Sequence, residues 1–230
     1  MRNWRVALAF VLAPLAWAQT GLDGHWEGIL KADSREIGLT LDLAKNAKAE
    51  WIASMGVPAQ NVTGLYVKDL VVNAKSVKFM AVELQMSICD LTLGADGKLT
   101  GTLSGPHGSM PIEFLRKGEA KVELPAPSPA VSKQLEGDWE GTLQTPGSEF
   151  PLTVHFKNQP DQTVAATIDI PKTGSIGMPV NDVRQSGQKV EFGLKIAHGS
   201  FQGTMNQEGT EITGQFSHEA DSMPLTLKKK

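Results

Sequence analysis

The sequence predicts an all-β protein made of two tandem, small, antiparallel up-and-down β-barrels with about eight strands each. The first observation is a repeat: the nine residues LDGHWEGIL (22–30) return as LEGDWEGTL (135–143), 113 positions later (139 − 26). The second is an alternation of apolar and polar residues over short stretches, which is the period of a strand with one buried face. The third is a series of turn signals such as Gln207-Glu208-Gly209, with no sustained helical periodicity after residue 18.

The offset of 113 continues along the whole repeat and indicates a duplicated domain. It places Pro58 on Pro171, Gly64 on Gly177 and Asp69 on Asp182, and it places ICDLT (88–92) on FQGTM (201–205). We therefore predict one barrel over residues 21–117 and a second over residues 135–230. The segment 118–134 contains ELPAPSPAVSK, and its Pro and Ala content predicts a semi-rigid extended linker without a core element.

Residues 1–18 have the pattern of a secretory signal peptide. Arg2 and Arg5 form a positive end, Val6–Leu15 an apolar stretch, and Ala16-Trp17-Ala18 a small-x-small cleavage site. The apolar stretch is too short to cross a bilayer, which requires about 20 residues. We therefore expect a secreted or periplasmic protein without stable membrane insertion.

The strands of the first repeat are placed by alternation and by the turns between them. Leu39, Leu41 and Leu43 alternate with more polar residues, for example, as do Leu152, Val154 and Phe156 in the second repeat. Because no helix is predicted to cover a sheet, the strands must close into a barrel or pack as an open sandwich, which is the alternative architecture. The eight strands are expected to begin near His25, Ile37, Ala49, Leu65, Val77, Gln85, Leu99 and Met110.

Charge and cysteine content argue against a nucleic-acid-binding protein and against a fold held by disulfides. The formal net charge is −3, and removal of Arg2 and Arg5 with the signal peptide makes it −5 (−3 − 2). The one basic block is Lys228-Lys229-Lys230, so we expect no nucleic-acid partner. Cys89 is the single cysteine, so no internal disulfide can form, and its apolar flanks predict an inert buried thiol.

The repeated Gly-x-Trp-x-Gly motif resembles the first strand of lipocalin-like and streptavidin-like barrels. In those barrels the Trp closes one end and the glycines allow the strand to bend. The resemblance implies structural roles for six residues, which are Gly24, Trp26, Gly28, Gly137, Trp139 and Gly141.

Each repeat as a whole resembles a narrower family, the β-rich module that precedes α/β-hydrolase or serine-hydrolase domains in secreted bacterial proteins. The second repeat carries the resemblance best, while the first has diverged. The resemblance does not extend to a hydrolase domain, so it does not imply hydrolysis. The matching stretches are ATIDIP (166–171), GMPV (177–180), FQGTM (201–205), ITGQF (212–216) and MPLTL (223–227).

No residue pattern points to a catalytic, cofactor or metal site. No Gly-x-Ser-x-Gly elbow is present, and Ser200, which lies near His198, is the nearest approach to one. The five histidines lack the spacing of metal ligands, and no glycine-rich phosphate loop precedes a helix. Glu27 and Glu140 recur in both repeats, but alternation points them away from the Trp face. We predict a protein that is not an enzyme.

The remaining hypothesis is an exported binding or accessory module that engages an unknown protein partner or a small apolar ligand. The alternatives are a lipocalin-type carrier of a small hydrophobic ligand and an esterase-like hydrolase or hydrolase-associated protein. Trp51 aligns with Val164, so the shared fold does not require a Trp there, and methionines adapt to apolar ligands. The candidate contact residues are Trp51, Met55, Met80 and Met86.

Overall fold

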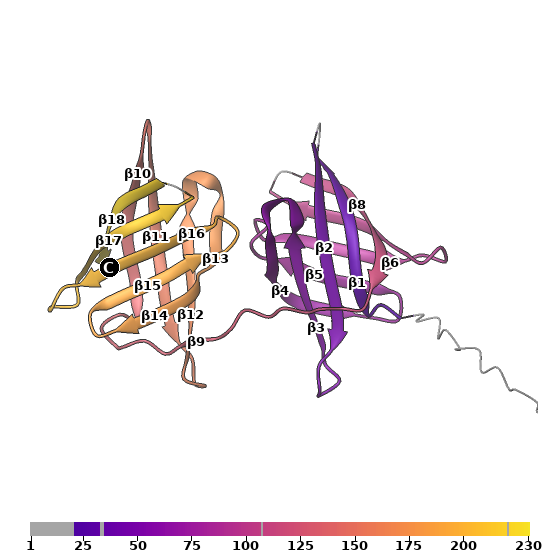
Figure 1. Cartoon of the computed structure of the whole chain (residues 1–230), viewed down its shortest axis with the longest axis horizontal. Helices are drawn as coiled ribbons and strands as arrows, with labels where there is room; N and C mark the ends of the chain where they lie inside the picture. Colours follow the sequence, from indigo (N-terminus) through magenta and orange to yellow (C-terminus); the bar gives the residue numbers. More distant parts are fainter. Residues whose placement is uncertain (1–20, 33–34, 107, 220) are drawn as a thin grey trace, which may run out of the picture.

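Strands form almost all of the regular structure in the computed structural model, which describes residues 21–32, 35–106, 108–219 and 221–230. Within these residues the only helical elements are the 3₁₀ turns η1 (Pro58–Gln60) and η2 (Pro171–Thr173). The predicted signal peptide, residues 1–18, lies outside the described residues. Figure 1 shows the strands gathered into two barrels. The segment that joins them passes the lower ends of both, and β9, which is part of this segment, is labelled at the lower end of the second barrel.

The first barrel is a closed, eight-stranded, antiparallel meander. Each strand pairs with the next along the chain, and pairing of the last strand with the first closes the barrel. Its strands are β1 (Gly24–Ala32), β2 (Arg35–Lys45), β3 (Trp51–Val57), β4 (Val62–Val72), β5 (Ser76–Ala81), β6 (Ser87–Leu93), β7 (Lys98–Gly105) and β8 (Gly108–Gly118).

The second barrel has the same order of pairing, but its fourth strand is divided at Val180 into β13 and β14. β13 pairs with β12 and β14 pairs with β15, so the two short strands together take the place of β4, which pairs with both of its neighbours in the first barrel. The strands are β10 (Gly137–Thr145), β11 (Ser148–Asn158), β12 (Thr163–Ile170), β13 (Ser175–Pro179), β14 (Asn181–Ser186), β15 (Lys189–Leu194), β16 (Gly199–Met205), β17 (Glu211–His218) and β18 (Asp221–Lys229). The predicted all-β fold with two tandem barrels is confirmed.

The two barrels share an irregularity in the fourth strand. Pairing with the fifth strand shifts between Lys68 and Val71 in the first barrel, and between Asn181 and Arg184 in the second. Inside each bulge an aspartate, Asp69 or Asp182, has a left-handed φ of 53° or 52°. Asp tolerates this conformation better than most residues. The bulge bends the strand away from its third-strand neighbour, and this shapes the candidate site below.

The barrel interiors are filled by the inward-facing residues of the alternating strands. Trp26 and Trp139 are almost fully buried, and each indole N–H donates a hydrogen bond to a main-chain carbonyl four residues earlier, Leu22 at 3.1 Å and Leu135 at 2.8 Å. A side chain at Gly28 would place its Cβ 2.5 Å from the ring of Phe114, so this position requires glycine. Other fully buried large side chains include Leu41, Leu43, Phe79, Leu91, Phe156 and Phe201.

The strand β6 lies one residue out of the register that the constant offset predicts. Phe79 pairs with Cys89 in the first barrel, whereas its counterpart Phe192 pairs with Phe201 in the second. Cys89, and not Ile88, therefore stands where Phe201 stands, and the placement of ICDLT on FQGTM is wrong by one residue. The cause is the turn before the strand, which spans 82–86 in one barrel and 195–198 in the other. Cys89 is fully buried, and burial raises the pKa of its thiol to about 12.

The segment between the barrels is attached to both of them. The amide N–H of Lys121 donates to Asp42 Oδ1 (2.7 Å), on the wall of the first barrel. Further along, β9 (Ser128–Pro129) pairs with β12, and the side chain of Val131 is only 8% exposed within the core of the second barrel. The prediction that 118–134 contributes no core element is therefore wrong, because Val131 packs into the barrel end.

Candidate binding site at the end of the first barrel

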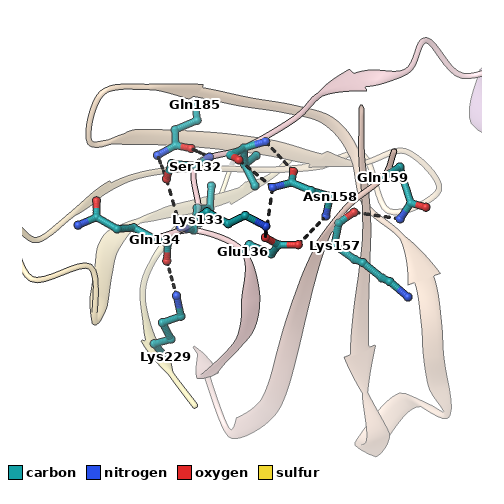
Figure 2. Close-up of polar contacts among 11 residues, drawn as sticks. Ser132, Lys133, Gln134, Glu136, Lys157, Asn158, Gln159, Gln185 and Lys229 are labelled. Carbon is teal, nitrogen blue, oxygen red and sulfur yellow. Dashed lines mark hydrogen bonds and ion pairs between the residues drawn. The ribbon is translucent and has the colours of Figure 1, made fainter. Parts of the chain in front are cut away.

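The end of the second barrel that holds Trp139 is covered by the chain that enters it. The side-chain amide of Asn158 accepts a hydrogen bond from the N–H of Val131 (2.9 Å) and donates one to the carbonyl of the same residue (2.9 Å). Gln185 also makes two hydrogen bonds to the next residue, Ser132. The N–H of Ser132 donates to Gln185 Oε1 (2.7 Å), and Gln185 Nε2 donates to Ser132 Oγ (2.9 Å). Figure 2 shows these contacts side by side. Two amide side chains thus clamp two consecutive residues of the entering segment.

Charged groups complete this cover. Glu136 accepts a hydrogen bond from the backbone N–H of Asn158 (3.2 Å) and pairs with Lys133 at 2.6 Å. The hydrogen bond from Lys133, together with those from Asn158, holds the pKa of the Glu136 carboxyl below its ordinary value. Lys229 donates to the carbonyl of Gln134, as Figure 2 shows, while its ammonium lies 5.5 Å from the centre of a Trp139 ring.

In the residues that the structure describes, which begin at Gly21, the same end of the first barrel has an open cavity. The cavity has a volume of about 760 Å³, and its apolar wall includes Leu22, Leu43, Trp51 and Val72. Trp51 is half-buried and packs against the barrel core. The polar part of the wall includes Asp23, Lys45, Arg116 and Glu119.

Two contacts organise the charges of this cavity. The Lys45 ammonium lies 5.1 Å from the centre of a Trp51 ring, a distance at which the ring and the cation attract each other. The Arg116 guanidinium lies 3.7 Å from the Asp23 carboxylate. An indole with a cation over its face and a nearby ion pair forms an amphipathic surface suited to a ligand with both apolar and polar groups.

Comparison of the two barrel ends shows which residues distinguish them. Lys45 occupies the place of Asn158, and Val72 occupies the place of Gln185, so neither clamp amide is present in the first barrel. Trp51 occupies the place of Val164, the residue that pairs with β9. The first barrel therefore replaces two hydrogen-bonding side chains with a cation and an apolar group, and adds an aromatic surface.

Of the four contact residues predicted from sequence, only Trp51 lines this cavity. Met55 is 2% exposed and lies inside the barrel, where it pairs with Leu41 and Leu65. Met80 is half-buried on the outer wall, because its strand neighbours Phe79 and Ala81 face inward. Met86 lies in the turn before β6 with a left-handed φ of 55°. The predicted set does not converge on one site.

Sequence reasoning missed Lys45 and Val72, although the repeat alignment already set them against Asn158 and Gln185. It also missed an exchange of partners on the barrel walls. In the first barrel His25 Nδ1 lies 2.9 Å from Asp42 Oδ1, and in the second His155 Nδ1 lies 2.8 Å from Asp138 Oδ1. His25 aligns with Asp138, and Asp42 aligns with His155, so the pair is kept with its members swapped.

His155 has a second carboxylate neighbour, because its Nε2 lies 3.2 Å from Asp169 Oδ2. Partial burial lowers the pKa of the imidazole, but the hydrogen bonds to Asp138 and Asp169 outweigh burial and raise it above its ordinary value. The Asp169 carboxylate also accepts the N–H of Gly177 (2.7 Å). The group is a carboxylate–imidazole–carboxylate bridge across neighbouring strands.

The residues weighed for catalysis are separate from this cavity. Among the described residues no hydrogen bond joins Ser200 to His198, and both line a polar groove of about 950 Å³ between residues 122–126 and the strands β14–β16. The Glu27 and Glu140 side chains are about half exposed, and Glu140 pairs with Lys230 at 2.9 Å. In the described chain no group of three or more His, Cys, Asp or Glu side chains is arranged to hold a metal ion. The described part of the chain contains no helix that is long and apolar enough to cross a membrane.

Comparison with solved structures yields distant matches. No protein-family model matches the chain, and no curated protein matches it. The crystal structure of a "putative outer membrane protein" from Bacteroides fragilis is 16% identical, with 90% of this chain and 97% of that chain covered and a TM-score of 0.27. A protein of unknown function of the DUF3598 family from Nostoc punctiforme is 11% identical, with 91% and 96% covered and a TM-score of 0.28. Neither similarity bears on function.

Proposed function

We propose that the chain is an exported, non-catalytic binding module that holds a protein partner at the Trp51 end of its first barrel. One observation carries the proposal: a chain segment covers this end in the second barrel, whereas in the first barrel the same end is a Trp-lined cavity of about 760 Å³. Export rests on the signal-peptide pattern of residues 1–18.

The packing of the barrels favours a protein partner over a small apolar ligand. Carriers of the lipocalin type hold their ligand inside the barrel, whereas here Trp26, Phe79 and Phe114 fill that space and are at most 1% exposed. The cavity lies outside this packed core, and its wall contains four charged side chains beside the apolar ones. Trp and Arg, which this wall contains as Trp51 and Arg116, are enriched in protein contact surfaces.

The resemblance to modules that precede secreted hydrolases is compatible with an accessory role. In that role the module would position an enzyme or its substrate, and two barrels on one chain would provide two contact surfaces at high effective concentration. The barrel ends differ in their residues, so the two barrels are expected to make different contacts.

The test is capture from the native source with the chain from Gln19 onward, compared with its Trp51→Val variant. Valine is the residue at the equivalent place in the second barrel, so the variant is expected to fold. The matched control is Ile29→Thr, which replaces a 50% exposed apolar residue of the outer wall with its counterpart at Thr142. We expect one component to be retained by the wild type and by Ile29→Thr, and to be reduced at least tenfold by Trp51→Val.

Equal recovery with all three proteins would refute the proposed site. Chromogenic esters test the absence of catalysis. Turnover by the wild type that is lost in Ser200→Ala would replace the binding function with hydrolysis.

A further inference from the structure

The second barrel contains an example of strand addition within its own fold. The short strand β9 pairs in antiparallel fashion with β12, at Thr163 and Val164. On the same side, Ala130 N–H donates to the carbonyl of Gln162, which directly precedes β12 (2.9 Å). On the other side of β9, Ser128 Oγ accepts the N–H of Val183 in β14 (2.9 Å). β9 therefore fills a slot between the third strand and the second half of the fourth.

This slot follows from the bulge that the two barrels share. In the first barrel β3 pairs with β4 between Ser54 and Val57, whereas β4 pairs with β5 on both sides of the bulge and as far as Val72. The register of the described strands gives Trp51–Ala53 of β3 no partner on β4. The slot thus recurs in the first barrel, with Trp51 and Leu70 at the places of Val164 and Val183.

Resting on the proposed function, we propose that the partner binds as an extended peptide segment, which adds to β3 as a short strand in the way that β9 adds to β12. Main-chain hydrogen bonds to the exposed edge supply sequence-independent affinity, and the side chains at the slot select the sequence. Asn158 satisfies both the N–H and the carbonyl of Val131, whereas Lys45 can only donate. The segment bound to the first barrel therefore presents a carbonyl or carboxylate to Lys45.

The remaining differences define the apolar part of the segment. Val72 stands where Gln185 holds the hydroxyl and N–H of Ser132, so an apolar side chain replaces that serine in the partner. Trp51 offers a larger contact surface than Val164, which suits a residue with an apolar side chain at the place of Val131. The chemical class is an extended apolar segment with one acceptor group, and Pro is tolerated as in β9.

The experiment supplies the slot with a tethered segment, so that weak affinity does not hide binding. In this variant the sequence PSPAVLK, which is residues 127–133 with leucine in the place of Ser132, directly precedes Gly21, which corresponds to Gln134 before the second barrel. A short tether gives an effective concentration on the order of millimolar. The readout is hydrogen exchange of the Leu70 amide, the counterpart of the Val183 amide that donates to β9.

We expect the tether to slow exchange at Leu70 at least tenfold. In a second tether, Pro takes the place of Ala130. Because Pro has no N–H to donate to the turn between β2 and β3, this tether should not protect Leu70. As a positive control, Lys45→Asn, Val72→Gln and Trp51→Val together give the first barrel the slot residues of the second, and this triple variant carries the unchanged sequence PSPAVSK. Protection only in this triple variant, or in none of the variants, would overturn the proposal.

The tethered variant also separates this inference from the proposed function. Displacement of the Trp51-dependent component by the tether supports both. Protection at Leu70 with the component still bound would retain the slot but refute the proposed binding site. A Trp51-dependent component without any tether protection would retain the binding function and refute the peptide as its ligand.

Discussion

Replacement of Trp139 by alanine should destabilise the second barrel selectively. Trp139 is fully buried, and aromatic side chains of this kind bury about 150–250 Å². At about 25 cal/mol per Å² this area corresponds to about 4–6 kcal/mol, and measured losses for Trp→Ala in cores are about 3–5 kcal/mol. The substitution also removes the donor to the buried carbonyl of Leu135, which adds to the cost. We expect a loss of about 3–5 kcal/mol, a large part of the 5–15 kcal/mol that is usual for a domain.

The assay is differential scanning calorimetry of the full chain. For a barrel of this size each kcal/mol shifts the melting temperature by about 4–8 °C, so one transition should fall by at least about 12 °C. Trp26→Ala should lower the other transition by a similar amount and thereby assign the two. The matched control is Trp51→Val, where the side chain is half-buried and valine occurs in the other barrel, and its expected effect is below about 1 kcal/mol. Equal shifts of both transitions in Trp139→Ala would refute the argument, because they would show that the barrels unfold as one unit.

Three further predictions concern the second barrel and the thiol. Val131→Ala removes two buried methyl groups and should destabilise the second barrel by about 1.5 kcal/mol with no change in the first, as measured by urea denaturation. Because the pKa of His155 is raised in the folded state, the bridge to Asp138 and Asp169 stabilises the fold fully below pH 6.5 and loses this effect as the pH rises through the folded-state pKa. The melting temperature of the second barrel should therefore fall as the pH rises through that pKa, and His155→Gln should abolish the fall. Cys89, with its pKa near 12 and full burial, should react with a thiol reagent only as fast as the barrel opens, and rapid labelling in native buffer would contradict this.

The fold was predictable because closed antiparallel barrels impose a simple rule on sequence. Each strand needs an apolar residue at every second position, and Leu39, Leu41 and Leu43 follow this rule without exception. The slip in β6 was harder to see, since an ungapped alignment carries Ile88 to the place of Phe201. The alternation of Cys89 and Leu91 with polar residues contained the correct register, because a slip of one residue turns every side chain to the other face.

The linker and the candidate site were less predictable, because tertiary contacts decide them. A Pro- and Ala-rich segment has the composition of a spacer, and only the amide of Asn158 and the open barrel end turn Val131 into a core residue. Trp51 was found because the second repeat has valine there. Met80 and Met86 were grouped with it by chemical type, which does not reveal on which side of a strand a residue lies.

The two attachments of the linker also limit how far apart the barrels can move. The amide of Glu123 donates to Ser54 Oγ of the first barrel (3.1 Å), and pairing with the second barrel begins at Ser128. Five Cα-to-Cα steps separate these two residues, so a fully extended chain spans about 17 Å between them. As long as both attachments hold, the two attachment points cannot move further apart than this length. This limits the spacing of any two sites on one surface that the two barrels contact at the same time. Separation beyond this length would require these few hydrogen bonds to break.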